Sequence, residues 1–372
     1  MKIALLHATC LLVVTLAAAL PVSGPHQNDL PRLVIYYQTT HDPLGRPISM
    51  LPLVTEMGIS LTHLIVSSFH INRGGVIHLN DSPPQKPMFY TLWNETQVLQ
   101  SAGVKVLGML GGAAAGSFST HTLDGDGASF EFYYGQLYGV LKAYQLDGLD
   151  IDVEQGMTQA GISRFVRRLR RDFGPDFVIT LSPVATALRG GSNLSGFSYL
   201  TLEKQLGREI AFYNAQFYNG FGSMNKTDEF DRIIKFGWNP QKIVVGQVTA
   251  PVNGYGHVPF KNFNATIAAL RRKYGHESIG GVMGWEYFNS GPVGVAAPWR
   301  WAQIMTAILR PRSRVDLRIT THKAKGLAQA WMESASSEVT LRTSSGGLVS
   351  AMVSNHGDEN LPTVDYMAMV NA

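Results

Sequence analysis

The 372-residue sequence contains a single cysteine, Cys10, so the chain cannot form an internal disulfide and its fold must rest on a hydrophobic core. It also lacks a glycine-rich phosphate-binding loop and any pair of Cys or His residues at the spacing of a zinc site. We therefore expect neither a cofactor nor a metal ion. Charged residues are sparse, at 16% against 45% hydrophobic residues, which is typical of a globular protein and not of a disordered or fibrous one.

The small net charge of +4 does not gather into a surface that would bind nucleic acid. Basic residues are densest in one short run, which comprises Arg164, Arg167, Arg168, Arg170 and Arg171. Apolar residues lie between them at spacings of three and four, namely Ile162, Phe165, Val166, Leu169 and Phe173. This spacing predicts an amphipathic helix with its arginines on a solvated outer face, which we favour over a phosphate-binding stripe. No nucleic-acid partner is expected.

The N-terminus has the three parts of a secretory signal peptide. Lys2 supplies a basic start, an apolar stretch runs to Leu20, and the small residues of Pro21–Gly24 follow. The stretch is too short and too poorly flanked to span a membrane, so no membrane association is expected. We interpret residues 1–24 as the signal peptide of a secreted, extracellular protein, and both Ala19 and Gly24 remain candidate cleavage points.

Sequons for N-glycosylation agree with passage through a secretory route. The Asn-x-Ser/Thr pattern occurs five times, and the candidate acceptors are Asn80, Asn94, Asn193, Asn225 and Asn264.

From residue 32 to about residue 310, short β-branched runs alternate with longer stretches of helical periodicity. The predicted strands are Leu33–Tyr37, Thr62–Phe69, Val104–Leu110, Gly148–Val153, Phe177–Ser182, Ile210–Tyr218, Lys242–Val248 and Gly280–Trp285. Strict strand-then-helix order predicts an α/β fold, a closed parallel (β/α)8 barrel of the TIM type, over residues 30–311. An open doubly wound sheet is the alternative. Such sheets usually have fewer strands, and no Gly-x-Gly-x-x-Gly motif follows the first strand here.

The end of the chain differs in character from the barrel. The last barrel helix is predicted over Trp299–Leu309. Beyond it, residues 312–372 contain one modest helical stretch, Lys323–Ser334, and then a segment rich in Ser, Thr and Gly. We interpret them as a C-terminal extension of unknown role, packed on the barrel surface or partly disordered.

Three acids alternate along the predicted strand Gly148–Val153 and its end. Asp150, Asp152 and Glu154 share one face, because successive side chains of a strand point to opposite sides, and the residues between them are apolar. Active sites of such barrels lie at the carboxyl ends of the strands, so the acids should line the interior and rise toward the open rim. Burying three carboxylates together is costly, since like charges a few ångströms apart cannot all ionise. A purely structural cluster would need cationic or metal partners, which the other strands do not offer at that spacing.

The stretch Asp147–Glu154 resembles the Asp-Gly-x-Asp-x-Asp-x-Glu signature of family-18 glycoside hydrolases, and every acid of that signature is present. The resemblance implies that Glu154 is the general acid that protonates the leaving glycosidic oxygen. It also implies that the 2-acetamido oxygen of the substrate attacks the anomeric carbon and forms an oxazolinium ion, without a nucleophile from the protein. Asp152 would orient and stabilise the acetamido N–H, and Asp150 would share a proton with Asp152. The sugar at the cleaved bond must then carry an N-acetyl group.

Other strand ends resemble the same family. The run Gln216-Phe217-Tyr218-Asn219 ends the sixth predicted strand, and the match makes Tyr218 the hydroxyl that binds the acetamido oxygen, with Gln216 and Asn219 beside the substrate. The eighth strand ends at Trp285, which looks like the indole that forms an apolar floor under the distorted sugar. An indole face suits that role because it packs well on the C–H surface of a sugar.

The first three strands carry further matches. Tyr36 and Phe69 match aromatic positions close to the same sugar, and Gly111 and Gly112 match paired glycines that leave room for it. The family commonly has serine two residues before those glycines, whereas this chain has Met109. That departure concerns the packing of the barrel more than the acids.

Within the family, the chain is most similar to fungal secreted endo-β-N-acetylglucosaminidases, which cut the chitobiose core of N-linked glycans between its two N-acetylglucosamines. The segments that carry this resemblance are Tyr36–Asp42, Leu92–Thr96, Gly284–Ser290 and the terminal Asp365–Ala372. The resemblance implies N-linked glycans of glycoproteins as the substrate and a monomeric enzyme.

Two other functions stay open: a chitinase acting on chitin oligosaccharides, and a non-catalytic sugar-binding relative. The second is disfavoured because Glu154 is present. The connection from Val248 to Gly280 has room for only a loop and one helix, so the α+β insertion of many chitinases is absent and the site should be open. Three loops that follow predicted strands are small and contain no tryptophan, namely Thr39–Asp42, Gly112–Gly116 and Val184–Ala187. They favour a branched glycan over a linear run of stacked sugars.

Overall fold

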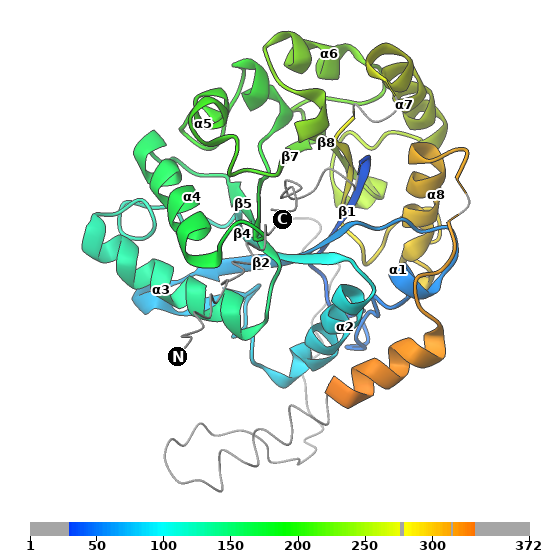
Figure 1. Ribbon diagram of the computed structural model, residues 1–372, viewed down its shortest axis with the longest axis horizontal. Coiled ribbons are helices and arrows are strands. Elements are labelled where there is room, and N and C mark those ends of the chain that lie inside the picture. The colour runs from blue at the N-terminus through cyan, green and yellow to red at the C-terminus, as the bar shows by residue number, and fades with distance from the viewer. Residues whose placement is uncertain (1–29, 276–278, 314, 332–372) are drawn as a thin grey trace, which may run out of the picture. The chain divides into compact units, whose positions relative to one another are not determined.

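Eight parallel strands within the described residues close into a barrel (Figure 1). The computed structural model describes residues 30–275, 279–313 and 315–331. The strands of the barrel are β1 (Arg32–Tyr37), β2 (His63–Ile71), β4 (Lys105–Gly112), β5 (Gly148–Val153), β6 (Val178–Leu181), β7 (Phe212–Gln216), β8 (Ile243–Val248) and β9 (Gly281–Trp285). The barrel closes because β1 pairs in parallel with both β2 and β9. The predicted (β/α)8 fold is confirmed.

Helices surround the strands, as Figure 1 shows. They are α1 (Pro52–Thr55), α2 (Tyr90–Ser101), α3 (Gly127–Ala143), α4 (Gln159–Phe173), α5 (Tyr199–Leu206), α6 (Asp228–Lys235), α7 (Phe260–Tyr274) and α8 (Trp299–Leu309). Local sequence sets their ends: the Asp126 side chain accepts a hydrogen bond from the Ser129 N–H at the start of α3, and Thr158 caps α4 in the same way. Gly174 ends α4 at φ +80°, a backbone conformation that glycine adopts without steric cost.

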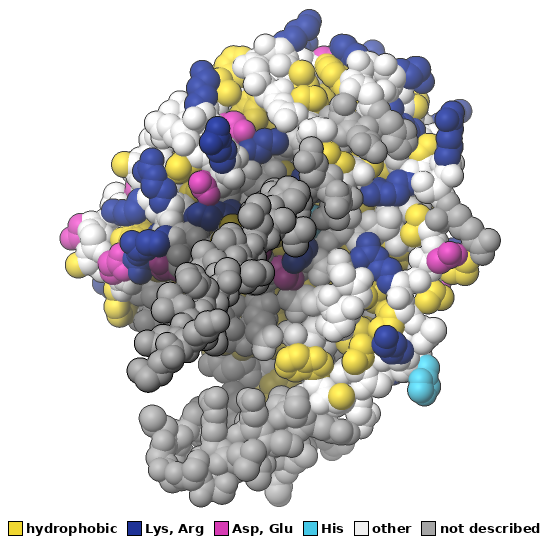
Figure 2. Space-filling model, in the orientation of Figure 1, with side chains coloured by type: hydrophobic (Ala, Val, Ile, Leu, Met, Phe, Trp, Pro, Cys, Tyr) yellow, Lys and Arg dark blue, Asp and Glu magenta, His cyan; other side chains and the backbone are white. Residues whose placement is uncertain are grey.

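The arginine-rich helix α4 buries its apolar stripe, including Ile162, Phe165 and Leu169, against the barrel. Two of its arginines form ion pairs within the protein: Arg168 pairs with Glu131 and Asp172, and Arg170 pairs with Glu209. Figure 2 shows acidic side chains interspersed among the basic ones over this part of the surface.

The core has two layers. One lies inside the barrel and includes Val34, Leu107, Met109, Val244 and Met283. The larger layer lies between the strands and the helices. Alternation along each strand explains the division, because neighbouring residues point alternately inward and outward.

Two local features depart from the predicted pattern. A three-residue strand, β3 (Ile77–Leu79), pairs antiparallel with the end of β2 and forms a hairpin outside the barrel ring. The register of β2 against β4 also shifts between Val66 and Phe69. An irregularity of this kind reverses the side to which the following residues point.

The connection between β8 and β9 contains α7 and the short 3-10 helix η6 (Pro251–Asn253), and its described residues hold no additional strand. The expected absence of an α+β insertion therefore agrees with this part of the fold. No helix within the described ranges has both the length and the hydropathy required to cross a membrane.

The described residues up to Ala328 form one compact unit. Within it, the first part of the C-terminal extension contacts the barrel: the Arg318 guanidinium donates to the backbone oxygen of Ala102, and Ile319 and Ala324 are buried. Residues 321–331 are helical, which overlaps the predicted Lys323–Ser334. The candidate signal peptide and residues 332–372 lie outside the described residues.

Candidate active site

The three acids of β5 lie where the alternation predicts, on the inner face of the barrel. Asp150 is fully buried, Asp152 is 6% exposed, and Glu154, just beyond the end of the strand, is half-buried. Exposure therefore rises along the row from the barrel interior toward its rim. The outermost acid is the one that a substrate would meet first.

The Asp150 carboxylate accepts hydrogen bonds from side chains on or just after three other strands. The Tyr36 hydroxyl donates to Asp150 Oδ2 over 2.7 Å, and the Ser182 hydroxyl donates to the same oxygen. Thr180 Oγ1 and Asn214 Nδ2 donate to Oδ1 over 2.5 and 3.1 Å. Burial raises the pKa of Asp150, while these four hydrogen bonds act to lower it.

Asp152 has fewer and longer hydrogen-bond contacts than Asp150. Its pKa is raised well above the usual range by burial, and further by the negative charges of Glu154 and Asp150. Its carboxylate oxygen Oδ1 lies 3.4 Å from Gln216 Nε2. Because four donors stabilise the charge of Asp150 and one long contact reaches Asp152, we expect a shared proton to reside mainly on Asp152.

The Gln216 side chain contacts two of the acids, Asp152 and Glu154. Its Nε2 lies 3.4 Å from Asp152 Oδ1 and 3.2 Å from Glu154 Oε1, and it donates to the backbone oxygen of Ser182 over 2.9 Å. An amide nitrogen has two hydrogens for these three acceptors, so its bonds to the acids can be exchanged. Gln216 therefore contacts the catalytic candidates directly.

Tyr218 follows β7 and is 6% exposed inside the barrel mouth. Burial raises the pKa of its hydroxyl well above 10, and the charges of Asp152, Glu154 and Asp150 raise it further, so the group stays a hydrogen-bond donor. The next residue, Asn219, adopts φ +54°, which Asn tolerates better than most residues. Asn219 Oδ1 accepts from the backbone N–H of Tyr255 over 2.9 Å. Its side chain thus holds a loop at the rim.

The Trp285 indole is half-buried at the end of β9, with its ring centroid 5.5 Å from that of Tyr36 at an angle of 59°. Tyr36 is 1% exposed and points its hydroxyl at Asp150. The structure therefore places Trp285 at the mouth and Tyr36 beneath it, where Tyr36 supports both the indole and the innermost acid.

The two glycines of β4 have different surroundings. A Cβ atom at Gly111 would lie 2.2 Å from the backbone oxygen of Asp152 and 2.5 Å from the Phe118 ring, so the packing of β4 on β5 requires glycine there. A Cβ at Gly112 would meet Asp152 Oδ2 at 3.9 Å, so this position borders the acids directly. Met109 is buried in the inner core, where its sulfur lies 3.5 Å from the Ser67 hydroxyl.

Phe69 does not lie at the site, and its expected contact with the sugar is a correction. The ring is fully buried in the outer core layer, stacked on Trp93 of α2 at a centroid distance of 6.4 Å. The register shift of β2 before Phe69 explains the outcome, because it turns the side chain from the inner to the outer face. The resemblance to the family therefore placed this side chain on the wrong side of the strand.

Several residues around the acids were missed by the sequence analysis. Thr180 of β6, Ser182 just after β6, and Asn214 of β7 are buried donors to Asp150. A signal for them exists, since Thr180, Ser182, Asn214 and Gln216 are polar residues at alternate positions of strands that are otherwise apolar or aromatic.

Glu286 was also missed. This buried acid follows Trp285, and its Oε2 accepts from the backbone N–H groups of Gln38 and Thr39 over 3.2 and 2.8 Å. Asn80 Nδ2 donates to the backbone oxygen of Gln38 over 3.1 Å. Side chains from two other segments thus fix the loop that follows β1.

The candidate glycan acceptors differ in their surroundings. Asn264 on α7 and Asn225 before α6 are exposed, and the exposed Asn193 donates from Nδ2 to the backbone oxygen of Phe197. Asn94 is half-buried within α2. Asn80 uses both ends of its amide inside the fold, since Oδ1 accepts from the Ser68 N–H and Nδ2 donates to Gln38.

Comparison with known protein families identifies the family of this chain. The model of the glycosyl hydrolases family 18 matches residues 32–257, which is more than half of the chain. The chain belongs to this family. Within the described residues, no group of three or more His, Cys, Asp or Glu side chains is arranged to hold a metal ion.

Two solved structures of fungal enzymes are similar to this family-18 chain. A fungal endo-β-N-acetylglucosaminidase of the family is 62% identical, with a TM-score of 0.75 over 77% of this chain and 100% of that one. The chitinase ChiC from Aspergillus fumigatus is 48% identical, with a TM-score of 0.68 over 74% of this chain and 98% of that one. Chitinase 1 of Rhizopus niveus is 26% identical over 60% of this chain. The chain spans less than half the length of the first curated chitinases that it matches, 39% and 47%.

Proposed function

We propose that this family-18 hydrolase is an endo-β-N-acetylglucosaminidase that cleaves the GlcNAc-β-1,4-GlcNAc bond of the N-glycan chitobiose core with retention of configuration. The row formed by Asp150, Asp152 and Glu154 supports the chemistry. The preference for a glycan core over chitin rests on the greater identity to the fungal endo-β-N-acetylglucosaminidase, 62% against 48% for the A. fumigatus chitinase.

In the proposed first step, Glu154 donates its proton to the glycosidic oxygen, and the bond between that oxygen and the anomeric carbon breaks. The acetamido oxygen of the sugar attacks the same carbon and forms the oxazolinium ion. Asp152 accepts a hydrogen bond from the acetamido N–H, and the Tyr218 hydroxyl donates to the acetamido oxygen. The raised pKa of Tyr218 suits this role, because a neutral hydroxyl remains a donor throughout.

In the second step, water attacks the anomeric carbon of the oxazolinium ion. The carboxylate of Glu154, left without its proton by the first step, removes a proton from that water. The acetamido group is restored, and Glu154 is protonated for the next cycle. Both steps invert the anomeric carbon, so the product keeps the β configuration.

Chitin cleavage is the second candidate, because the A. fumigatus and R. niveus relatives are named chitinases. The two substrates share the sugar on each side of the cleaved bond and differ in what lies beyond it. They can therefore be separated only by the products that they yield.

The deciding experiment gives the enzyme a denatured high-mannose glycoprotein and chitin oligomers under equal conditions. We expect mass spectrometry of the glycopeptides to show a single N-acetylglucosamine left on asparagine, with much slower cleavage of chitin oligomers. Ready cleavage of chitin oligomers, together with an intact glycan on the glycoprotein, would establish the chitinase instead.

We also propose that the enzyme is of fungal type and secreted as a monomer after removal of residues 1–24, with residues 30–311 as the catalytic domain. Asn225 and Asn264 are the acceptors best placed to carry its own glycans, since both are exposed. Asn80 is poorly suited, because it is half-buried and its amide bonds to Ser68 and Gln38 within the fold.

A further inference from the structure

Two neighbouring loops of the rim expose apolar side chains. Val252 and Tyr255, in the loop after β8, are 81% and 79% exposed, and Val293 and Val295, in the loop after β9, are 50% and 41% exposed. We call these four residues the apolar ledge. Tyr255 is the most exposed Phe, Trp or Tyr side chain of the described residues.

The part of the apolar ledge that follows β8, Val252 and Tyr255, lies on the rim between the two side chains that would border the sugar, and Val293 and Val295 follow the second of them along the chain. Strand β8 lies between β7, which leads to Tyr218, and β9, which ends in Trp285. The N–H of Thr249, at the end of β8, donates to the backbone oxygen of Trp285 over 2.7 Å. Asn219, the neighbour of Tyr218, exchanges two hydrogen bonds with the backbone of Tyr255, of 2.8 and 2.9 Å. Both loops are therefore joined directly to residues of the site.

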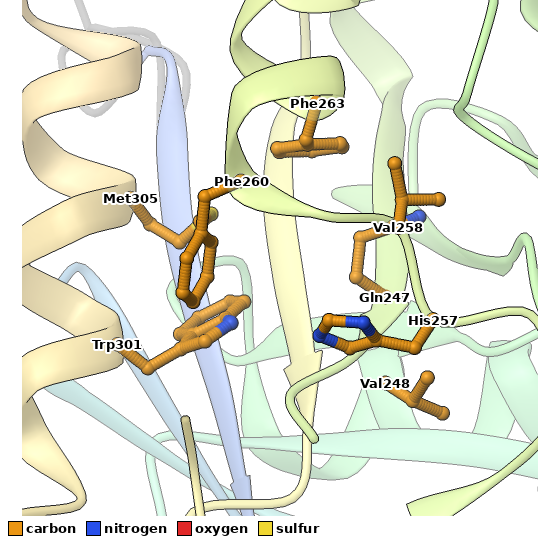
Figure 3. A pocket seen from close by; sticks show the side chains of 8 residues that line it. All are labelled: Gln247, Val248, His257, Val258, Phe260, Phe263, Trp301 and Met305. Carbon is orange, nitrogen blue, oxygen red and sulfur yellow. The ribbon is translucent and has the colours of Figure 1, made fainter. Parts of the chain in front are cut away.

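The two loops are also fixed to each other and to the barrel. The side-chain amides of Asn253 and Asn289 exchange two hydrogen bonds of 2.7 Å. Beneath the loop after β8, the His257 ring faces Phe260 edge to face and points toward Trp301 (Figure 3). The space left among these side chains is only about 10 Å³, room for about one water molecule. The ledge is thus held in place before any partner binds.

Exposed apolar side chains on a fixed support favour a partner that covers them. Three of the four are valines, whose branched aliphatic surface offers no flat face for a sugar ring, whereas it packs well on apolar amino-acid side chains. In a glycoprotein the polypeptide begins one sugar beyond the cleaved bond, so that it reaches the rim of the site. We propose that the apolar ledge binds apolar side chains of the polypeptide that carries the glycan.

This proposal rests on the proposed function and adds a selectivity to it. Apolar residues around a glycosylated asparagine are accessible mainly when the glycoprotein is unfolded or the segment is extended. The enzyme should therefore prefer glycans on unfolded segments with apolar flanks, and the preference should come from binding and not from the chemical step.

The test uses three substrates with the same high-mannose glycan: a glycopeptide with leucines beside the asparagine, one with serines there, and the free oligosaccharide with an intact chitobiose end. For the wild-type enzyme we expect kcat/KM about tenfold higher on the leucine peptide than on the serine peptide. In the double variant Val252→Ser, Tyr255→Ser that preference should fall to near unity through a higher KM, while cleavage of the free oligosaccharide stays at the wild-type rate. Phe132→Ser, on the outer face of α3 and 49% exposed in the wild type, is the matched control and should keep the preference.

The outcomes separate the competing explanations. A double variant that keeps the wild-type preference overturns the ledge proposal. So does an equal loss on all three substrates, which would mean that the ledge holds a sugar. A wild-type enzyme that cleaves chitin oligomers but none of these substrates refutes the proposed function itself, and the ledge proposal falls with it.

Discussion

At the scale of single residues, Glu154 carries the proposed proton transfer. Glu154→Gln keeps the shape of the side chain and removes the acid, so we expect a loss of kcat of about 10²–10⁴-fold with little change in thermal stability. Release of glycan, followed by mass spectrometry, measures the activity, and circular dichroism checks the fold. Glu131→Gln, at an exposed position of α3, is the matched control. A folded Glu154→Gln enzyme with normal turnover would exclude this residue as the acid.

Asp152 gives a prediction about stability. Burial and the charges of Glu154 and Asp150 raise its pKa in the folded state, whereas the pKa of Asp in an unfolded chain is about 3.9. The raised pKa therefore stabilises the fold below the unfolded value, and this contribution is lost as the pH rises toward the folded value. Asn cannot ionise. Asp152→Asn should thus abolish activity yet unfold at a higher temperature than the wild type at pH 7.

The difference in unfolding temperature between Asp152→Asn and the wild type should shrink as the pH falls to about 4. Thermal unfolding followed at several pH values measures it. Asp176→Asn, at an exposed turn before β6, should show no such trend. A difference for Asp152→Asn that is constant with pH would mean that its carboxyl does not take up a proton on folding.

The sequence predicts the row of acids because period-two alternation is strict in a straight strand. The family resemblance was wrong for Phe69, since the register shift after Val66, which turns this side chain outward, has no mark in the sequence. Nor did a motif mark Thr180, Ser182 and Asn214, because their role as donors to Asp150 depends on strands that meet only in the closed barrel. The acids of the row were therefore easier to predict than the side chains that donate hydrogen bonds to them.

At the scale of secondary-structure elements, the close approach of β4 and β5 positions the acids. A Cβ at Gly111 would come within 2.2 Å of the Asp152 backbone oxygen, and its φ of +106° disfavours any other residue. We expect Gly111→Ala to lower the free energy of unfolding by at least about 3 kcal/mol. Gly135→Ala is the control: it lies in α3 with no atom within 4 Å of the added Cβ, and it should raise stability by about 0.5–1 kcal/mol. Urea unfolding compares the two, and equal effects would contradict this account.

Regular elements were predicted better than irregular ones. Helix α8 has the predicted bounds, Trp299–Leu309, and every barrel strand overlaps its predicted range. Strand β3 was missed, because three residues are too few to show a period of two. The predicted strand Ile210–Tyr218 is shorter in the structure, since β7 ends at Gln216 and leaves Tyr218 beyond it at the rim.

At the scale of the whole molecule, few acids are buried within the described residues. The buried acids of the described residues are Glu95, Asp150, Asp152 and Glu286. Glu286 is occupied by the backbone of Gln38 and Thr39, and Glu95 by the Ser49 hydroxyl and the Met50 N–H. Retention with a carboxylate nucleophile requires a second acid about 5–5.5 Å from the first, across the scissile bond. Asp152, the neighbour of Glu154 in the row, interacts with its charge, and the proposed mechanism assigns Asp152 to the acetamido N–H.

In the proposed mechanism the acetamido oxygen of the substrate is the nucleophile, and this assignment yields the last prediction. Two successive displacements at the anomeric carbon should release the β-anomer first, and proton NMR of the fresh product, recorded before mutarotation, measures it. A thiazoline analogue of the oxazolinium ion should inhibit the enzyme, because it resembles the high-energy intermediate, and a substrate without the N-acetyl group should not be cleaved. An initial α-anomer would show a single displacement by water. Inversion requires a separate general base on the opposite face of the sugar ring, so this outcome would contradict the proposed mechanism.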